Sequence, residues 1–248
     1  MISIIITAYN KLAYTQKCIN SIIKTAHDFE IIVINNASTD GTKEWLDDLA
    51  LKNKNIIPIH NKVNKGQTGR NDGLVIARGD ILFQIDNDVE VYGDWQDICT
   101  KELQHKTIGA VGHQGLFVKL DRQPTRSRPH GEVIFFGYTT GGSRYVDLLV
   151  GYFWAFRREI YDKLGGYDEA FGRFGCEESD FHLKIKSHGF RIKTVPIKIK
   201  HYGHITESQF NRSDSERLVK KNMGLLLNKW GGKVDQLNLE TMKNELSK

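Results

Sequence analysis

The chain has 248 residues, of which 40% are hydrophobic and 26% are charged, a balance typical of globular proteins with a sizeable core. The formal net charge of +5 suits an anionic substrate or an acidic membrane surface, but it is too small to indicate nucleic-acid binding. The three cysteines, Cys18, Cys99 and Cys176, form no CxxC pair, which argues against a zinc site or a disulfide framework.

No stretch of the sequence approaches the ~18 apolar residues that span a membrane. Residues 1–6 contain no basic segment, and their apolar run is too short for a signal peptide. We therefore expect a cytoplasmic protein whose only route to a membrane is peripheral contact at the inner face.

The first hundred residues alternate short β-branched runs with amphipathic stretches. Buried strands are predicted at 2–6, 30–34, 56–60 and 80–85. Helical spacing of apolar residues predicts helices around 19–26 and 95–103, and over 42–51 and 66–77. Strands that alternate with helices indicate a mostly parallel sheet, and the ligands of such sheets bind at the carboxyl ends of the strands.

The second half of the chain is less regular. Residues 112–150 are rich in glycine and predict loops and short strands. Further strands are predicted at 152–156, 191–195 and 197–201, and helices over 157–164 and 179–188. An amphipathic stripe that ends at Trp230 predicts a C-terminal helix.

The tripeptide Asp86-Asn87-Asp88 directly follows the fourth predicted strand. Mg²⁺ and Mn²⁺ prefer carboxylate oxygens, and Mg²⁺ is commonly bound by one or two carboxylates together with substrate phosphates. Acidic turns without a metal are about as common, so the tripeptide alone leaves both interpretations open. Its position beside residues 7–10 and 35–36, which also follow strands, favours a metal site at this edge of the sheet.

Three carboxylates, Glu177, Glu178 and Asp180, stand around the start of the predicted 179–188 helix. Acidic residues favour the N-terminus of a helix because of the helix dipole, which accounts for one or two of them. A carboxylate that faces a cleft can instead serve as a general base. The sequence leaves the two interpretations with equal weight.

Two further signals are weaker. His201 and His204 follow the last predicted strand, where a histidine can bind a metal or pack on the surface. The Lys65-Gly66 turn precedes a predicted helix, so its lysine and free backbone amides suit an anion.

Six segments, in this order, resemble the family 2 glycosyltransferases of the GT-A fold. They are residues 3–10, 33–42, 64–66 with 70–71, 79–88, 165–169 and 177–180. The resemblance implies an α/β fold with a mostly parallel, Rossmann-like central sheet flanked by helices and a C-terminal helical segment. It implies a glycosyltransferase domain at 1–205 and a helical extension at 206–248. Within the domain, 1–110 would bind the nucleotide sugar, and 111–205 would bind the acceptor and carry the catalytic groups.

The resemblance also implies a role for each matching residue. The nucleotide sugar would contact Thr7, Ala8, Tyr9, Asn10, Asn35, Asn36, Asp40, Lys65, Gly66, Arg70, Asp86 and Asn87. Mn²⁺ or Mg²⁺ would be held by Asp86 and Asp88 of the DxD motif and by His201. Glu178 would be the general base, with Glu177 and Asp180 as alternatives. Tyr152 and Trp154 are candidates to stack on an acceptor sugar, and burial in the core is the alternative for both.

Two positions depart from the family pattern. Asn35 stands where an aspartate usually reads the base, and its amide brings donors as well as an acceptor, so the identity of the base stays open. Glu178 stands where the family commonly has an aspartate as the base, which keeps the carboxylate and adds one methylene.

We therefore expect an inverting glycosyltransferase that uses a UDP, dTDP or GDP sugar. The acceptor would be a hydroxyl of a glycan or a lipid-linked molecule, in the assembly of a bacterial surface polysaccharide or glycoconjugate. The cluster Arg122, Arg126 and Arg128 suits either a phosphate-bearing acceptor or a solvated basic loop, and the C-terminal stripe suits either packing on its own domain or a homodimer contact. The alternatives are a sugar nucleotidyltransferase, disfavoured because residues 7–11 are not rich in glycine and arginine, and a non-catalytic module that binds a nucleotide sugar or a glycan.

Overall fold

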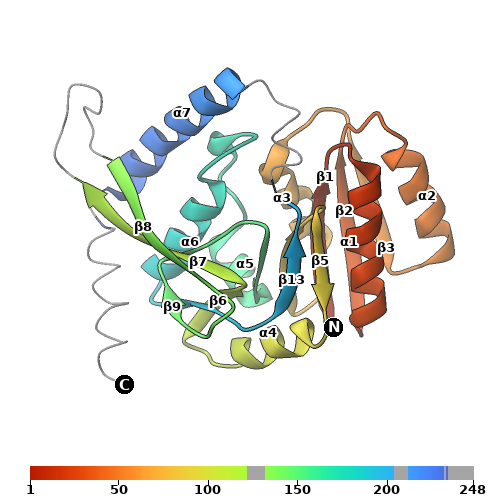
Figure 1. The fold of residues 1–248 in the computed structure, drawn as a ribbon, viewed down its shortest axis with the longest axis horizontal. Coiled ribbons are helices and arrows are strands. Elements are labelled where there is room, and N and C mark those ends of the chain that lie inside the picture. Colours follow the sequence, from red (N-terminus) through yellow and green to blue (C-terminus); the bar gives the residue numbers. More distant parts are fainter. Residues whose placement is uncertain (122–131, 204–211, 232, 234–248) are drawn as a thin grey trace.

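The computed structural model describes residues 1–121, 132–203, 212–231 and 233 (Figure 1). These residues form an α/β fold around one eight-stranded sheet, with smaller sheets of three and two strands. The chain begins with β1 (Ile2–Ala8), α1 (Leu12–Thr25), β2 (Phe29–Asn36), α2 (Thr42–Lys52), β3 (Ile56–Asn61), the 3₁₀ helix η1 (Gly66–Gly69), α3 (Arg70–Ile76), β4 (Ile81–Asp86), β5 (Val89–Tyr92) and α4 (Trp95–Leu103). It continues with β6 (Ile108–Gly112), β7 (Gln114–Asp121), β8 (Glu132–Thr140), β9 (Tyr145–Val146), β10 (Leu148–Leu149), β11 (Phe153–Arg157), α5 (Arg158–Leu164), η2 (Glu169–Phe171), α6 (Glu177–Ser187), β12 (Arg191–Thr194), β13 (Lys198–His201) and α7 (Arg212–Trp230).

The central sheet has the strand order β3-β2-β1-β4-β11-β6-β12-β9. Strands β3, β2, β1 and β4 are all parallel, as the alternation of strands and helices predicts. Beyond β4 the sheet is mixed, because β11 runs antiparallel to both β4 and β6, whereas β12 runs parallel to β6. The predicted α/β fold with a flanked central sheet is therefore confirmed, and its parallel character is concentrated in the N-terminal half.

Both faces of the sheet are covered by helices. Ile4 and Ile6 of β1 face one side of the sheet and Ile5 faces the other, because side chains alternate along a strand. Helices α1, α2 and α4 complete the core on the first side, and α3, α5 and α6 complete it on the second. Burial on both faces explains why the strands are continuous apolar runs.

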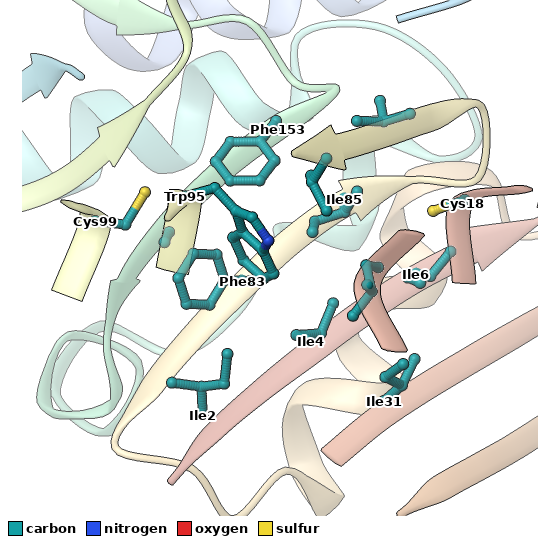
Figure 2. Close-up of a cluster of buried hydrophobic side chains, with 14 of the residues drawn as sticks. Ile2, Ile4, Ile6, Cys18, Ile31, Phe83, Ile85, Trp95, Cys99 and Phe153 are labelled. Carbon is teal, nitrogen blue, oxygen red and sulfur yellow. The ribbon is translucent and has the colours of Figure 1, made fainter. Parts of the chain in front are cut away.

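Aromatic packing closes the first of these cores (Figure 2). The ring of Trp95, the first residue of α4, meets the edges of Phe83 and Phe153 at centroid distances of 5.0 and 5.9 Å. Phe83 lies on β4 and Phe153 on β11, so this contact joins the parallel half of the sheet to the mixed half.

One predicted helix is divided in two. Residues 66–77 form the 3₁₀ helix η1 followed by the shorter α3. Gly66 has a φ of +62°, a left-handed conformation that glycine adopts at little cost and that keeps a regular helix from starting at this residue. Two further differences are β5, which follows the acidic turn, and the β7–β8 pair, where loops and short strands were expected.

The C-terminal helix α7 packs on the rest of the chain. Leu226 and Trp230 of α7 are buried together with Leu183 of α6 and Phe171 of η2. Figure 1 shows α7 beside α6, on the side of the molecule that also carries β8. In the part of the chain that the structure describes, no helix combines the length and apolarity needed to cross a bilayer.

Candidate active site

A cavity of about 320 Å³ opens at the carboxyl ends of β1, β2 and β4. This position agrees with the rule that ligands bind at the carboxyl ends of parallel strands. The residues predicted from the sequence that line the cavity are Thr7, Ala8, Tyr9, Asn36, Gly66, Asp86, Asn87, Asp88, Tyr152, Glu177, Glu178 and His201.

The acidic turn is held in place from two sides. Asn87 is buried and donates from Nδ2 to Thr15 Oγ1 of α1 at 2.9 Å. The backbone N–H of Asp86 donates to the carbonyl of Tyr152, also at 2.9 Å. These bonds leave the carboxylates of Asp86 and Asp88 directed to the cavity, because the middle residue of the turn makes the anchoring contact.

Asp86, Asp88 and His201 form a group that suits a metal ion, because one ligand atom from each lies within 4.8 Å of the others. His201 ends β13, which pairs antiparallel with β5, and its Nε2 lies 3.4 Å from Asp88 Oδ1. Two carboxylates match the preference of Mg²⁺ and Mn²⁺ for oxygen, and the open cavity leaves room for substrate phosphates. His204, the other histidine considered from the sequence, lies outside the described residues.

Arg70 lies beneath the cavity rather than in its lining, which corrects its predicted direct contact with the nucleotide sugar. Its side chain is fully buried at the start of α3. Nη2 donates to Asp86 Oδ1 at 2.5 Å, and Nη1 lies 3.5 Å from Glu178 Oε1. Burial favours the neutral guanidine, but Tyr167, Asp86 and Glu178 outweigh it and raise the pKa of Arg70. A permanent positive charge therefore lies between the acidic turn and Glu178.

Glu177 and Glu178 begin α6, and both line the cavity. Burial raises the pKa of the Glu178 carboxyl, and the charge of Asp86 adds to this effect while Arg70 opposes it. Burial, reinforced by the neighbouring Glu178, also raises the pKa of Glu177 well above its ordinary value. A carboxylate with a raised pKa is a stronger proton acceptor, which is the property that a general base requires.

Gly151 fixes where the Glu178 carboxylate can lie. A Cβ atom on Gly151 would sit 2.6 Å from Glu178 Oε1, so only glycine leaves room for the carboxylate here. The carbonyl of Gly151 also accepts from the Arg70 guanidinium at 3.4 Å. Gly151 is not predicted from the sequence, because a single glycine carries no signal of such a close contact.

Asp180 is not a candidate for the base. Its side chain is fully buried and accepts hydrogen bonds from Trp230 Nε1 at 2.7 Å and Lys229 Nζ at 2.9 Å. Two residues along an α-helix correspond to a rotation of about 200°, so Asp180 faces α7 when Glu178 faces the cavity. The prediction of Asp180 as an alternative base is therefore wrong.

Of the two aromatic candidates on and beside β11, Tyr152 reaches the cavity and Trp154 does not. Tyr152 lines the cavity, its ring stacks on that of His201 at 4.2 Å, and its hydroxyl lies 2.6 Å from His113 Nδ1. Trp154 is fully buried in the second core and packs against Phe181. The prediction that Trp154 stacks on an acceptor sugar is therefore wrong, and the core interpretation holds.

Four residues predicted to contact the nucleotide are not among those that line the cavity. Asn35 is buried, and its Nδ2 lies 3.1 Å from His60 Nδ1. Asn10 accepts a hydrogen bond from the backbone N–H of Thr39 through Oδ1 at 2.8 Å.

The other two make local contacts. Asp40 accepts from the backbone N–H of Leu12 at 2.8 Å and so anchors the start of α1. Lys65 pairs with Asp72 at 2.8 Å. All four side chains therefore make contacts within the protein and are absent from the cavity lining.

Gln67 and the segment 173–175 also line the cavity, although the sequence analysis did not select them. Gln67 accepts from Thr7 Oγ1 at 2.8 Å and donates to Asp86 Oδ1 at 3.0 Å, so it connects β1 to the acidic turn. Its place in the glycine turn at 64–67 was the one available signal. The cluster Arg122, Arg126 and Arg128 lies outside the described residues.

The fold and this cavity, with a carboxylate–histidine cluster at the end of β4 and a carboxylate at the start of α6, define a glycosyltransferase of the GT-A class. Residues 3–165 match the family model described as glycosyl transferase family 2, and residues 137–208 match the one described as the N-terminal domain of galactosyltransferase. The chain belongs to glycosyltransferase family 2, because the first match spans more than half of it. This assignment excludes the sugar nucleotidyltransferase alternative.

Two bacterial relatives illustrate how much of the chain is shared. An uncharacterized glycosyltransferase of Bacillus subtilis, EpsJ, is 25% identical over 233 residues, which are 89% of this chain and 67% of that protein. The poly(ribitol-phosphate) beta-glucosyltransferase of Bacillus spizizenii is 34% identical over 119 residues, which are 44% of this chain. The chain spans only 19% of the length of this second relative.

Two solved structures share the fold. GalNAc-T7 with UDP, GalNAc and Mn²⁺ superposes with a TM-score of 0.68 at 19% identity, over 81% of this chain and 43% of that one. The mannosyltransferase PcManGT of Pyrobaculum calidifontis, with GDP-Man and Mn²⁺, gives 0.59 at 21% identity, over 79% and 54% of the two chains. The bound UDP and GDP-Man carry different bases, so the shared fold does not select one base.

Proposed function

We propose that this glycosyltransferase inverts the configuration of the transferred sugar and uses Glu178 as its general base. The observation that supports this most strongly is the Arg70 guanidinium, which contacts Asp86 on one side and Glu178 on the other. Arg70 thereby holds the turn that would bind the diphosphate and the carboxylate that would act as the base beside the same cavity. A single displacement needs a base and a leaving-group site together in this way.

On the donor side, we propose that residues 1–110 bind the nucleotide sugar. Thr7, Ala8, Tyr9 and Asn36 line the part of the cavity at the ends of β1 and β2, which suits the nucleoside. When bound by Asp86, Asp88 and His201, Mn²⁺ or Mg²⁺ supplies positive charge that neutralises the departing diphosphate.

On the acceptor side, we propose that residues 111–205 bind a sugar or lipid-linked hydroxyl beside Glu178. Glu178 removes the hydroxyl proton while the oxygen attacks the anomeric carbon from the side opposite the diphosphate. The bond between the anomeric carbon and the diphosphate oxygen breaks, and its electron pair leaves with the nucleoside diphosphate. Arg70 stays charged throughout and keeps the Glu178 carboxylate turned toward the cavity.

The same proposal includes the cellular location of the reaction and the class of its acceptor. Both bacterial relatives are glycosyltransferases, and one of them has the polymer poly(ribitol-phosphate) in its name. We propose that the chain acts in the cytoplasm at the inner face of the membrane, on an acceptor used for a surface polysaccharide or glycoconjugate. The net charge of +5 favours contact with acidic lipid headgroups. Cosedimentation with anionic vesicles, absent for neutral vesicles, would support this.

The test begins with a thermal-shift screen of UDP, dTDP and GDP sugars, with and without Mn²⁺. Ligand binding to the native state raises the melting temperature, so the true donor is expected to stand out only when Mn²⁺ is present. Transfer to glycan and lipid-linked acceptors then follows with that donor, and NMR of the product gives the anomeric configuration. A retained configuration contradicts the inverting mechanism.

Glu178→Gln tests the base. We expect kcat to fall by about 10²–10⁴-fold, because the amide cannot accept the proton, while donor binding is unchanged. Glu44→Gln, which alters an exposed glutamate of α2, is the matched control and should transfer normally. Donor binding without any transfer or hydrolysis would instead support the non-catalytic alternative.

A further inference from the structure

The segment between η2 and α6 forms one wall of the cavity. Arg173, Phe174 and Gly175 line the cavity directly before Glu177 and Glu178 of α6. A Cβ atom on Gly66 would lie 1.8 Å from the Arg173 carbonyl oxygen, so the wall backbone touches the turn at η1. The wall, defined as residues 172–176, therefore spans from the donor side of the cavity to the general base.

The wall has a backbone that needs support. Gly172, Gly175 and Cys176 all have left-handed φ angles, of +68°, +91° and +72°. The value at Cys176 is unfavourable for a residue with a side chain. A segment with this conformation persists where surrounding contacts hold it.

Asn222 of α7 supplies these contacts. Its Nδ2 donates to the carbonyls of Phe171, Phe174 and Gly175 at 2.6, 2.8 and 2.9 Å. The Asn222 side chain is fully buried, and the three acceptors lie at or within one residue of the wall. A carboxamide has only two hydrogens, so the three short contacts gather the wall carbonyls around one nitrogen.

The same helix holds the start of α6. Trp230 and Lys229 of α7 both donate to Asp180, which lies two residues after Glu178. Lys229 also pairs with Asp168 at 2.8 Å, just before η2. Helix α7 thus contacts the chain before the wall, the wall itself and the helix that carries Glu178.

We propose that Asn222 is a positioning residue for the acceptor side of the cavity, which it fixes by holding the wall at 172–176 in place. This inference rests on the proposed function of Glu178. With the wall in place, the acceptor hydroxyl meets Glu178 and water is excluded. Without it, the acceptor is held loosely, and donor hydrolysis gains relative to transfer. The donor side is built mainly from β1, β2 and β4 and meets the wall at the turn at η1, so donor binding changes less than acceptor binding.

The alternative is that Asn222 only stabilises the fold, as the apolar residues of α7 do. Leu226 provides the matched control, because it is buried on the same helix and packs in the apolar cluster with Phe171, Leu183 and Trp230. Leu226→Ala lowers stability by removing packing, but it removes no hydrogen bond to the wall. A structural role for Asn222 therefore predicts the same behaviour for both variants.

The experiment compares Asn222→Leu, which keeps the number and branching of the side-chain heavy atoms and removes the donors, with Leu226→Ala and the unchanged chain. We expect Asn222→Leu to lower kcat/KM for the acceptor by about 10²-fold, the effect of a misplacement of about 1 Å. The KM for the donor should change much less, and the ratio of transfer to donor hydrolysis should fall. Leu226→Ala should lower the melting temperature without changing that ratio. Asn222→Ala, where water can replace the lost donors, serves if the leucine variant does not fold.

Limited trypsin digestion gives a second readout that does not depend on activity. Arg173 is exposed, so a loosened wall should be cut faster after Arg173, as measured by mass spectrometry. Faster cutting in the Asn222 variants and not in Leu226→Ala supports the proposal. Equal cutting and an unchanged transfer-to-hydrolysis ratio overturn it while leaving the proposed function intact. If the unchanged chain transfers no sugar from any donor, the proposed function fails, and the proposal fails with it even where trypsin shows that Asn222 holds the wall.

Discussion

The N-terminal and C-terminal halves of the chain contribute residues to the cavity in different ways. In the N-terminal half, β1, β2 and β4 are parallel and deliver their carboxyl ends to it directly. In the C-terminal half, Gly151, Glu178 and His201 come from a loop, a helix start and a strand of a separate small sheet. Topology therefore places the residues at the ends of β1, β2 and β4, whereas contacts between distant segments place Gly151, Glu178 and His201 and make them easier to disturb.

The largest expected effect comes from Arg70, which joins the two halves. Arg70→Met leaves the carboxylates of Asp86 and Glu178 close together without a cation. We expect the free energy of unfolding to fall by about 3–5 kcal/mol, as for one partner removed from a buried ion pair, and transfer to be lost. Urea unfolding measures the first effect. Lys43→Met, which breaks the exposed pair with Asp47, should leave the unfolding midpoint unchanged. A stable, active Arg70→Met variant would show that the halves are not coupled through this residue.

A change confined to the donor half should alter metal dependence. Asp88→Asn keeps the size of the side chain and removes its charge. We expect transfer to fall by about 10²–10³-fold and to need more Mn²⁺, because the diphosphate loses electrostatic stabilisation. Rates measured over a series of Mn²⁺ concentrations test this, with the exposed Asp94→Asn as control. An unaltered Mn²⁺ dependence would contradict the role of Asp88.

A change confined to the acceptor half should alter catalysis and leave donor binding intact. In Gly151→Ala the new methyl group meets the end of the Glu178 side chain, which can move aside without disturbing the backbone. We expect kcat to fall by up to about 10²-fold through displacement of the base, with an unchanged melting temperature. Gly142→Ala, where no atom lies within 4 Å of the added Cβ, is the control. Normal turnover of Gly151→Ala would rule out a fixed position for Glu178.

The smallest effect is a shift in pH dependence. Glu178 accepts a proton only when ionised, and burial raises its pKa above that of an ordinary glutamate. The rate should therefore fall as the pH drops through this raised pKa, so the acid limb should lie at a higher pH than an exposed glutamate gives. Thermal shifts with the donor over the same pH range separate this effect from loss of metal binding. An acid limb at the ordinary glutamate pKa would contradict the buried base.

The same division decides how much of the site could be predicted. The acidic turn at 86–88 and the pair Glu177-Glu178 were predicted correctly as cavity residues, because both stand at the ends of regular elements. Gly151 and Asn222 were missed, since their roles depend on atoms more than 25 residues away in the chain. Asp180 and Trp154 were predicted wrongly, because residue type and spacing do not tell which face of a helix or strand meets the cavity.

The sequence by itself determined the class of fold, the parallel N-terminal strands and the acidic turn that follows β4. These follow from local periodicity and from the rule that parallel strands share one functional edge. Only the tertiary structure decided that Arg70 lies beneath the cavity between Asp86 and Glu178. Arg70 and Glu178 are 108 residues apart in the chain. The tertiary structure also decided that α7 holds the wall through Asn222. Such contacts depend on burial and on the meeting of distant segments, which no local pattern encodes.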